Sequence, residues 1–170
     1  MRWQYCIFQS EIYVVWDTIY YVENINDLGC SDNVQLSETS EGYYASTPST
    51  TTDNQYVYFN KNGSNFRFQL DKSWCFELDF KTTNAVSFGT HNSTMGIRTL
   101  LGITSSKLNI WCNMKIKYDS DNGMVSGFVD DVEDTSRKIT VSGTQGLNPR
   151  IIDFNKDIDV IFKNVKSYYI

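Results

Sequence analysis

The chain has 170 residues, with 15 basic side chains, 20 acidic side chains and one histidine, so its formal net charge is −5. This length suits one domain with a real hydrophobic core, and 41% hydrophobic residues with two prolines exclude a disordered chain. The acidic balance argues against a nucleic-acid partner and against adsorption to acidic membranes, because no basic stripe is present to neutralise phosphates.

The composition points to one class of secondary structure. Serine (17), threonine (15) and asparagine (15) together outnumber the charged residues, aromatic residues make up 15% of the chain, and alanine occurs twice. Strands favour aromatic and β-branched residues, whereas helices favour Ala, Leu, Glu and Lys. We therefore predict an all-β protein with uncharged polar loops and faces.

The first 22 residues contain strand-like segments around Tyr5–Phe8 and Ile12–Trp16. They have no uninterrupted apolar stretch and no small-residue cleavage site, and no run in the chain approaches the ~18 apolar residues of a membrane span. We expect no membrane insertion. Either the chain is not exported by a cleaved signal peptide, or that signal lies outside this sequence. Residues 1–22 are predicted to be an N-terminal strand or attachment segment of the same domain, and residues 23–170 the β-sandwich itself.

Short amphipathic strands follow one another along the rest of the chain. After a polar stretch at 23–42, strands are predicted in the segments 55–60, 65–70, 74–80, 85–88, 97–103, 108–118, 124–132 and 158–170. Asn122-Gly123 is the strongest hairpin signal, because a type I′ turn needs positive φ at both central residues. Ten to twelve such strands bury their apolar faces by forming a two-sheet antiparallel sandwich, for which a jelly roll is the natural solution at this length.

Alternation along two strands predicts how the cysteines face. In 74–80, Cys75 shares a side with Glu77 and Asp79, opposite the aromatic residues. In 109–118, Cys112 shares the apolar side, whose other predicted members are Ile110, Met114, Ile116 and Tyr118. If both strands belong to one sheet, Cys75 and Cys112 point to opposite sides and do not bond. We expect free, partly buried thiols, and the absence of a CxxC pair argues against zinc.

Three stretches of the last 100 residues resemble the concanavalin-like (laminin-G-like, glucanase-like) jelly-roll superfamily. These are WCFELDFKTT, NIWCNMKIKYDSDNGMVSGFVDDV and the closing strand IDVIFKNVKSYYI, in which Phe-x-Asn-hydrophobic-Lys precedes an aromatic. The resemblance covers about residues 65–170. Similar domains occur in phage and archaeal-virus tail proteins and in microbial surface adhesins, and the Asn/Ser/Thr/Tyr-rich texture is similar to theirs. The resemblance thus implies a virion or cell-surface location, while fold alone does not assign function.

Two acidic patterns suggest chemistry, and each has a simpler explanation. Glucanases of this fold carry the pattern Glu-x-Asp-x-x-Glu on one strand. Glu77 and Asp79 match the first half of this pattern, but Thr82 stands at the position of the last Glu. Because hydrolysis needs two carboxyl groups in working positions, we favour a non-catalytic protein. Asp119 and Asp121 faintly resemble the start of a calcium loop, but the further oxygen ligands and the distal Glu of such a loop are not in place, and we favour a hairpin turn. The single histidine, His91, is predicted to lie in an exposed loop.

The aromatic and amide side chains predicted to face outward suit a sugar ring, whose C–H face stacks on an aromatic ring while its hydroxyls bond to amides and charged groups. The candidate glycan-binding residues are Trp111, Asn113, Tyr56, Tyr58, Arg67, Gln69, Glu77 and Asp79. Burial of these faces by the second sheet or by a partner subunit is the alternative.

We therefore expect a non-catalytic module of a virion tail or surface adhesin that binds glycan or a host receptor, with no required cofactor apart from calcium as an option. A structural or assembly subunit of a virion or fibre, including a homo-oligomer, is the first alternative. A glycoside hydrolase is the second. Two carboxylates about 5–9 Å apart in a groove would favour the hydrolase, and a large exposed apolar patch would favour the assembly subunit.

Overall fold

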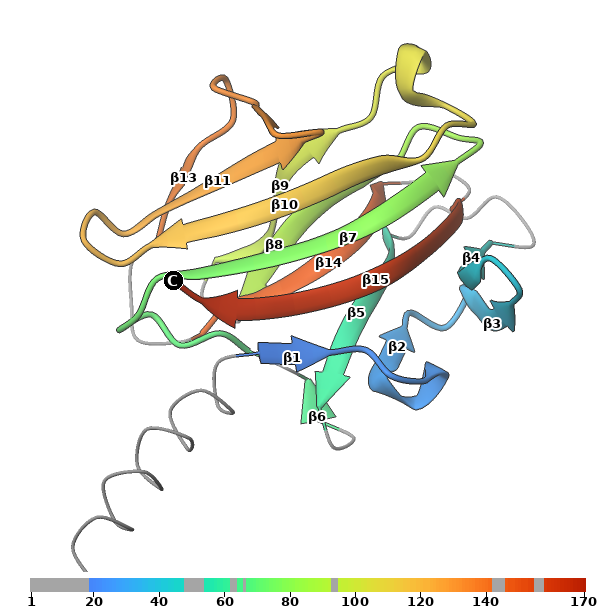
Figure 1. Ribbon diagram of the computed structural model, residues 1–170, viewed down its shortest axis with the longest axis horizontal. Helices are drawn as coiled ribbons and strands as arrows, with labels where there is room; N and C mark the ends of the chain where they lie inside the picture. The colour runs from blue at the N-terminus through green and yellow to red at the C-terminus, as the bar shows by residue number, and fades with distance from the viewer. Residues whose placement is uncertain are drawn as a thin grey trace, which may run out of the picture.

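The computed structural model is an antiparallel sandwich of two β-sheets (Figure 1). The structure describes residues 19–47, 54–61, 64–65, 67–92, 95–141, 146–154 and 158–170. Within them the only helical elements are two short 3₁₀ turns, Ile25–Asp27 and Ser105–Lys107. No helix in this described part of the chain has the length and apolar character needed to cross a membrane. The predicted two-sheet all-β architecture is thus confirmed.

The larger sheet, sheet A, has the strand order β12-β11-β10-β7-β15-β4-β3, with β1 paired to β15 and β13 paired to β11. Its strands are β1 (Ile19–Tyr21), β3 (Gln35–Thr39), β4 (Gly42–Ser46), β7 (Trp74–Thr82), β10 (Cys112–Asp119), β11 (Met124–Val129), β12 (Val132–Glu133), β13 (Ile139–Thr140) and β15 (Asp159–Tyr169). Strands far apart in the sequence are neighbours here, since β7 lies between β10 and β15.

The smaller sheet, sheet B, has the order β2-β5-β14-β8-β9, with β6 paired to β5. Its strands are β2 (Leu28–Cys30), β5 (Asn54–Lys61), β6 (Ser64–Asn65), β8 (Ser87–Asn92), β9 (Gly96–Gly102) and β14 (Asn148–Phe154). The chain crosses repeatedly between the sheets, as a jelly roll requires.

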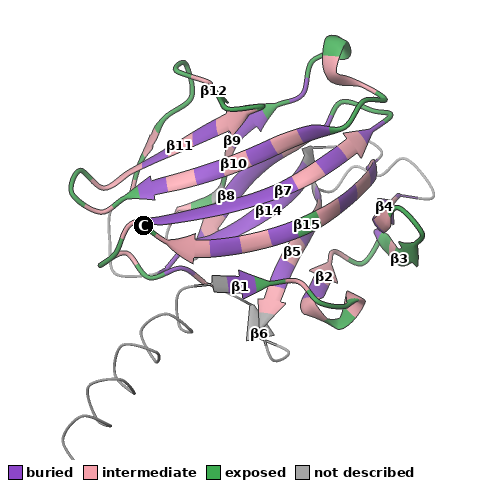
Figure 2. Cartoon of the chain, in the orientation of Figure 1, coloured by how far each residue is buried: buried purple, intermediate pink, exposed green. Residues whose placement is uncertain are grey.

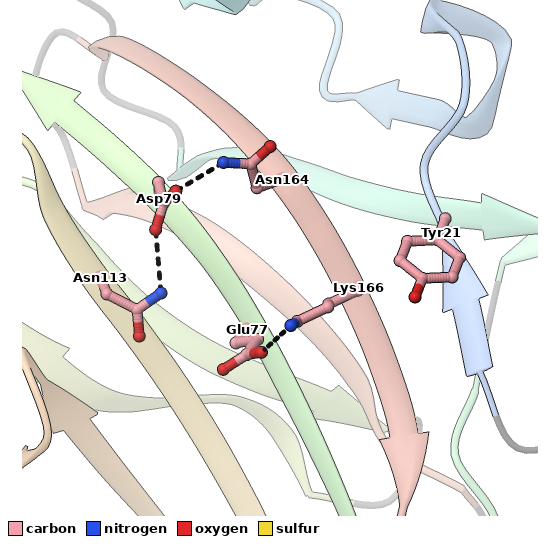
Figure 3. A pocket seen from close by; sticks show the side chains of 6 residues that line it. All are labelled: Tyr21, Glu77, Asp79, Asn113, Asn164 and Lys166. Atoms are coloured by element: carbon pink, nitrogen blue, oxygen red, sulfur yellow. Dashed lines mark hydrogen bonds and ion pairs between the residues drawn. The ribbon is translucent and has the colours of Figure 1, made fainter.

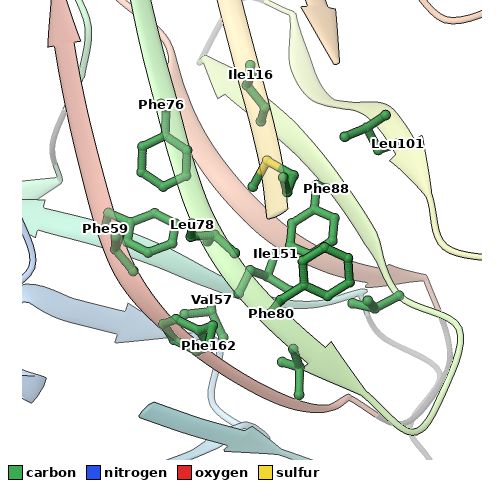
Figure 4. Close-up of a cluster of buried hydrophobic side chains, with 14 of the residues drawn as sticks. Val57, Phe59, Phe76, Leu78, Phe80, Phe88, Leu101, Ile116, Ile151 and Phe162 are labelled. Atoms are coloured by element: carbon green, nitrogen blue, oxygen red, sulfur yellow. The ribbon is translucent and has the colours of Figure 1, made fainter. Parts of the chain in front are cut away.

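The core lies between the two sheets, and both contribute aromatic rings to it (Figure 4). Phe162 of β15 and Phe76 of β7 in sheet A pack on Phe59 of β5 in sheet B, with ring centroids 6.3 Å and 4.7 Å apart. Phe80 and Phe88 make a second contact across the sandwich at 4.8 Å. Each strand therefore turns alternate apolar side chains inward and polar ones outward, as Figure 2 shows along β10 and β15.

The predicted facing of the cysteines is confirmed. Cys112 pairs with Phe80 in the register of β10 and β7, whereas Cys75 pairs with Lys117, so the two thiols lie on opposite sides of sheet A. Cys30, Cys75 and Cys112 are free thiols. Burial is the largest cause of the raised pKa of each of these thiols. Buried thiols of raised pKa hold little of the nucleophilic thiolate at neutral pH.

Two local predictions were wrong. Ile110, expected on the apolar face, is 48% exposed, because Asn109 adopts a left-handed φ of 60° and the regular alternation of β10 begins only at Cys112. His91, expected in an exposed loop, lies half-buried in β8, since its polar neighbours continue the ladder with β14 and β9.

The described N-terminal strand, β1, is part of sheet A. β1 adds to the edge of β15, with Tyr21 opposite Lys166 in the register, so residues 19–21 belong to the sandwich. The strands predicted at Tyr5–Phe8 and Ile12–Trp16 lie outside the described residues.

Candidate functional site

The outer face of sheet A carries a polar surface at its centre. Alternation turns Glu77 and Asp79 of β7 away from the core, and the register places Lys115 and Asn113 of β10 beside them on one side. Lys166 of β15 lies opposite Glu77 on the other side. Three adjacent strands therefore present charged and amide groups on a single surface.

A hollow of about 370 Å³ lies in this surface, and we call it the sheet A hollow. It is lined by Tyr21, Glu77, Asp79, Asn113, Asn164 and Lys166, drawn in Figure 3. The volume falls in the range of pockets that hold a small ligand, which is about 300–1,000 Å³. Its lining is polar, unlike the mostly apolar pockets that hold drug-like molecules.

Asp79 fixes two asparagine amides at one end of the hollow. The side-chain nitrogen of Asn113 donates to one carboxylate oxygen of Asp79 at 2.9 Å, and that of Asn164 donates to the other at 2.7 Å. Because a carboxylate only accepts, it sets which end of each amide it meets. Figure 3 shows both amide oxygens turned away from Asp79. The buried Oδ1 atom of Asn113 has no hydrogen-bond partner among the described residues.

A β-bulge brings Asn164 into the hollow. Lys163 pairs with Asp79 and Lys166 pairs with Glu77, so three steps along β15 match two steps along β7. The extra residue is Asn164, whose φ of 53° lies in the left-handed region that asparagine tolerates better than most residues. The bulge also resets the alternation, and Val165 enters the core while Lys166 turns outward.

Glu77 lies between two lysines at the other end of the hollow. Its carboxylate oxygens are 2.7 Å from Nζ of Lys166 and 3.7 Å from Nζ of Lys115, and the residue is 7% exposed. The hydrogen bond from Lys166 to Glu77 is the largest cause of the raised pKa of that lysine. Glu77 therefore anchors the ammonium group of Lys166, whereas the closer partner of Lys115 is Asp131 at 2.5 Å.

Trp111 lies farther along the same face, 38% exposed. The Nζ atoms of Lys163 and Lys81 are 4.1 Å and 5.3 Å from the centre of its ring, which is cation–π geometry. Lys163 is the register partner of Asp79, so the ring lies next to the hollow without lining it.

The structure divides the predicted glycan-binding residues between the two sheets. Trp111, Asn113, Glu77 and Asp79 gather on sheet A, as described. Tyr56 and Tyr58 lie on β5 in sheet B and stack on Arg150, which sequence reasoning did not single out. Arg67 is half-buried near them, and Gln69 is exposed on the same segment. The eight residues therefore do not form one site.

The predicted calcium ligands support a turn. Asp119 accepts hydrogen bonds from the backbone nitrogen of Asp121 at 2.9 Å and from the side chain of Asn122 at 2.7 Å, so both of its carboxylate oxygens stabilise the β10–β11 hairpin. In the described ranges, no group of three or more His, Cys, Asp or Glu is placed to hold a metal ion. The donor set at this turn does not fit a calcium ion, which takes six to eight oxygens.

Thr82, which stands where the glucanase pattern has its last Glu, has a structural role in this fold. Thr82 is 1% exposed, and its hydroxyl lies 2.7 Å and 2.9 Å from the carbonyl oxygens of Asn84 and Asp159. The side chain therefore ties β7 to β15 on the core side of the sheet, away from Glu77 and Asp79.

Three residues of the hollow were missed from the sequence, namely Tyr21, Asn164 and Lys166. Asn164 and Lys166 belong to the Phe-x-Asn-hydrophobic-Lys pattern of the closing strand, so a signal was present. Simple alternation places Asn164 on one face and Lys163 on the other, and only the bulge lets both point outward. No sequence signal marked Tyr21, because strand order alone brings β1 to β15.

Comparisons with known proteins place the fold. No family model and no curated protein sequence matches the chain. Among solved structures, the marine PL7 alginate lyase AlyA1 from Zobellia galactanivorans matches with a TM-score of 0.59 and 12% identity over 82% of each chain. Carbohydrate-binding module CBM66 from Bacillus subtilis matches with a TM-score of 0.54 and 10% identity over 88% of this chain and 99% of that one. A sialidase matches with a TM-score of 0.59 and 7% identity, and the chain spans 17% of its length.

Identities this low show the fold alone. The protein shares its two-sheet jelly-roll sandwich with carbohydrate-binding module CBM66 and with the alginate lyase, which confirms the fold part of the sequence resemblance. The likeness covers most of the described chain.

Proposed function

We propose that this protein is a non-catalytic glycan-binding module and that its ligand occupies the sheet A hollow. The observation that carries the proposal is the pair of asparagine amides, Asn113 and Asn164, that the Asp79 carboxylate orients at one end of the hollow. Asn164 is exposed, and its amide oxygen faces away from Asp79 and is open to a hydroxyl donor from a ligand.

The rest of the hollow complements a sugar. The amide oxygen of Asn164 accepts from hydroxyl groups, and the ammonium group of Lys166 donates to hydroxyl or ring oxygens. Tyr21, 52% exposed, and Trp111 offer aromatic surface for the C–H face of a ring. The fold lends support, because a carbohydrate-binding module is among the structures that share it.

A binding role agrees better than hydrolysis with the state of the two carboxylates. A glycosidase needs one carboxyl group as acid and another as nucleophile or base, both free to reach the glycosidic bond. Asp79 accepts from two amides, and Glu77 is paired with two lysines. Thr82 supplies no third carboxylate. We therefore assign Glu77 and Asp79 the role of positioning the groups that contact the ligand.

The setting is also a proposal. The resemblance to tail-protein and adhesin modules supports a location on a virion or cell surface, where the glycan or receptor would be presented by another cell. Assembly into a homo-oligomer is compatible with this role and is tested by sedimentation analysis of the purified chain.

A glycan array with and without calcium tests the proposal. We expect the wild-type protein to bind one class of glycan, and Trp111→Ala and Asn113→Ala each to weaken binding about tenfold, as the loss of ~1.4 kcal/mol implies. The thermal midpoint should stay unchanged in Trp111→Ala and fall by about 2–4 °C in Asn113→Ala, which loses the hydrogen bond to Asp79. Val132→Ala, which trims a 71% exposed apolar side chain outside the hollow, is the matched control. An array without any ligand, or two variants that bind like wild type, overturns the proposal.

A further inference from the structure

A cluster of basic side chains lies on the outer face of sheet B, on the opposite side of the sandwich from the sheet A hollow. Arg150 of β14 is at its centre and is 7% exposed. Its guanidinium carbon is 4.4 Å from the ring centre of Tyr56 and 5.4 Å from that of Tyr58. The register of β14 and β5 places Arg150 opposite Tyr58, so the stacking follows from strand pairing.

The backbone holds Tyr58 in this position. Gly29 of β2 is the register partner of Tyr58, and a Cβ atom at position 29 would lie 2.3–2.6 Å from two atoms of its ring and from its hydroxyl oxygen. The ring therefore packs directly on the β2 backbone, which only glycine permits without displacement of the ring. The surface around Arg150 is thus built by three neighbouring strands.

Two further basic groups face Arg150. His91 of β8 is the register partner of Asn148, two residues before Arg150 on the same face. Arg67 is brought close by the bridge between Phe68 and Leu147, whose backbone groups hydrogen-bond at 2.8 Å and 3.0 Å. Burial and the charges of Arg150 and Arg67 lower the pKa of His91.

Among the described side chains, no carboxylate forms an ion pair with the arginines of the cluster, Arg67 and Arg150. Arg150 donates a hydrogen bond from Nε to the side chain of Asn148 at 3.4 Å and another to the side chain of Tyr56. These two contacts use only some of the five N–H donors of its guanidinium group. The buried Nδ1 atom of His91 has no partner in the described ranges. A buried guanidinium without a carboxylate is costly, and a bound anion relieves that cost.

We propose that Arg67, His91 and Arg150 form a second binding site, separate from the sheet A hollow, for an oxyanion group such as a carboxylate, sulfate or phosphate. The planar guanidinium groups match the geometry of two oxyanion oxygens. Tyr56 and Tyr58 flank the site with half-buried rings that can contact the body of the molecule carrying the anion.

The single histidine of the chain makes the test direct, because His91 alone gives imidazole resonances in an NMR spectrum. The pKa of His91 is measured by pH titration in sodium chloride, sulfate, phosphate and glucuronate at equal ionic strength. A bound oxyanion next to the ring is expected to raise the pKa by about one unit relative to chloride. A shift in sulfate or phosphate indicates that the site takes the free ion or its ester. A shift in glucuronate indicates that the site takes the carboxylate of a sugar.

Variants distinguish an anion bound at the cluster from a general effect of salt on the pKa of His91. Arg150→Gln and Arg67→Gln are each expected to abolish the oxyanion-dependent shift, and Arg67→Gln keeps the test valid if Arg150→Gln does not fold. Arg137→Gln removes an exposed arginine elsewhere and should leave the shift unchanged, as should Trp111→Ala. An identical pKa in all four salts, or a shift that survives in both cluster variants, overturns the proposal. Neither outcome depends on glycan binding in the sheet A hollow.

Discussion

Replacement of Asp79 by alanine tests whether one carboxylate organises the sheet A hollow. The side chain accepts hydrogen bonds of 2.9 Å and 2.7 Å from Asn113 and Asn164. Without it both amides lose the acceptor that fixes their orientation, and the oxygen of Asn113 is no longer directed to one position. The variant should therefore reduce both the stability of the fold and the affinity for a glycan.

The magnitude follows from the two hydrogen bonds. A hydrogen bond to a charged group contributes about 1.5–3 kcal/mol. Asp79 is only half-buried, so solvent screening reduces each contribution to about 1 kcal/mol. The free energy of unfolding should fall by about 2 kcal/mol in total, which for a domain of this size lowers the thermal midpoint by roughly 4–8 °C. Glycan affinity should fall about tenfold or more, since each tenfold step corresponds to ~1.4 kcal/mol.

Urea unfolding and calorimetry measure the first effect, and titration calorimetry with the best array ligand measures the second. Asp79→Asn is an informative second variant. It keeps the shape of the side chain but presents one amide nitrogen, so Asn113 or Asn164 must rotate and turn its own nitrogen into the hollow. We expect a smaller loss of stability than in Asp79→Ala, with a comparable loss of affinity. Asp71→Asn, an exposed aspartate outside the hollow, is the control.

Unchanged stability together with unchanged affinity in Asp79→Ala would refute this reasoning. A loss of stability at full affinity would show that the carboxylate supports the sheet without orienting the ligand-binding amides.

Two further predictions concern the core and the sheet B cluster. Phe162→Ala should lower the free energy of unfolding by about 3–5 kcal/mol, because this fully buried ring packs on Phe59 of the other sheet. Urea unfolding measures this loss, and Phe128→Ala, which trims a half-exposed ring, is the control. An equal loss in both variants would contradict the prediction. Arg150→Gln in chloride should raise the pKa of His91, because a positive charge that disfavours the imidazolium is removed. In the wild type the unfolded chain binds the histidine proton more readily, so this group lowers stability as the pH falls below its ordinary pKa of 6.5. Stability measured between pH 5 and 7 should therefore depend less on pH in the variant, and an unchanged His91 pKa by NMR would argue against contact with Arg150.

Local patterns predicted the elements and much of the facing. The alternation of WCFELDF and CNMKIKY assigned the inner and outer residues of β7 and β10 correctly, because side chains on a strand alternate regardless of its neighbours. It therefore also placed Glu77, Asp79 and Asn113 on the solvent side before any strand order was known. The same alternation failed at Ile110, where a left-handed residue interrupts the strand.

Tertiary structure alone decided which outward residues meet. Strand order joins β7, β10, β15 and β1, which are separated by long stretches of sequence, and a single-residue bulge turns Asn164 toward Asp79. Strand order also places Tyr56 and Tyr58 in sheet B rather than sheet A, and there they stack on Arg150. Sequence periodicity encodes the face of each strand, because that depends on neighbours along the chain. Pairing between strands depends on packing of the whole core, and no short stretch of sequence contains that information.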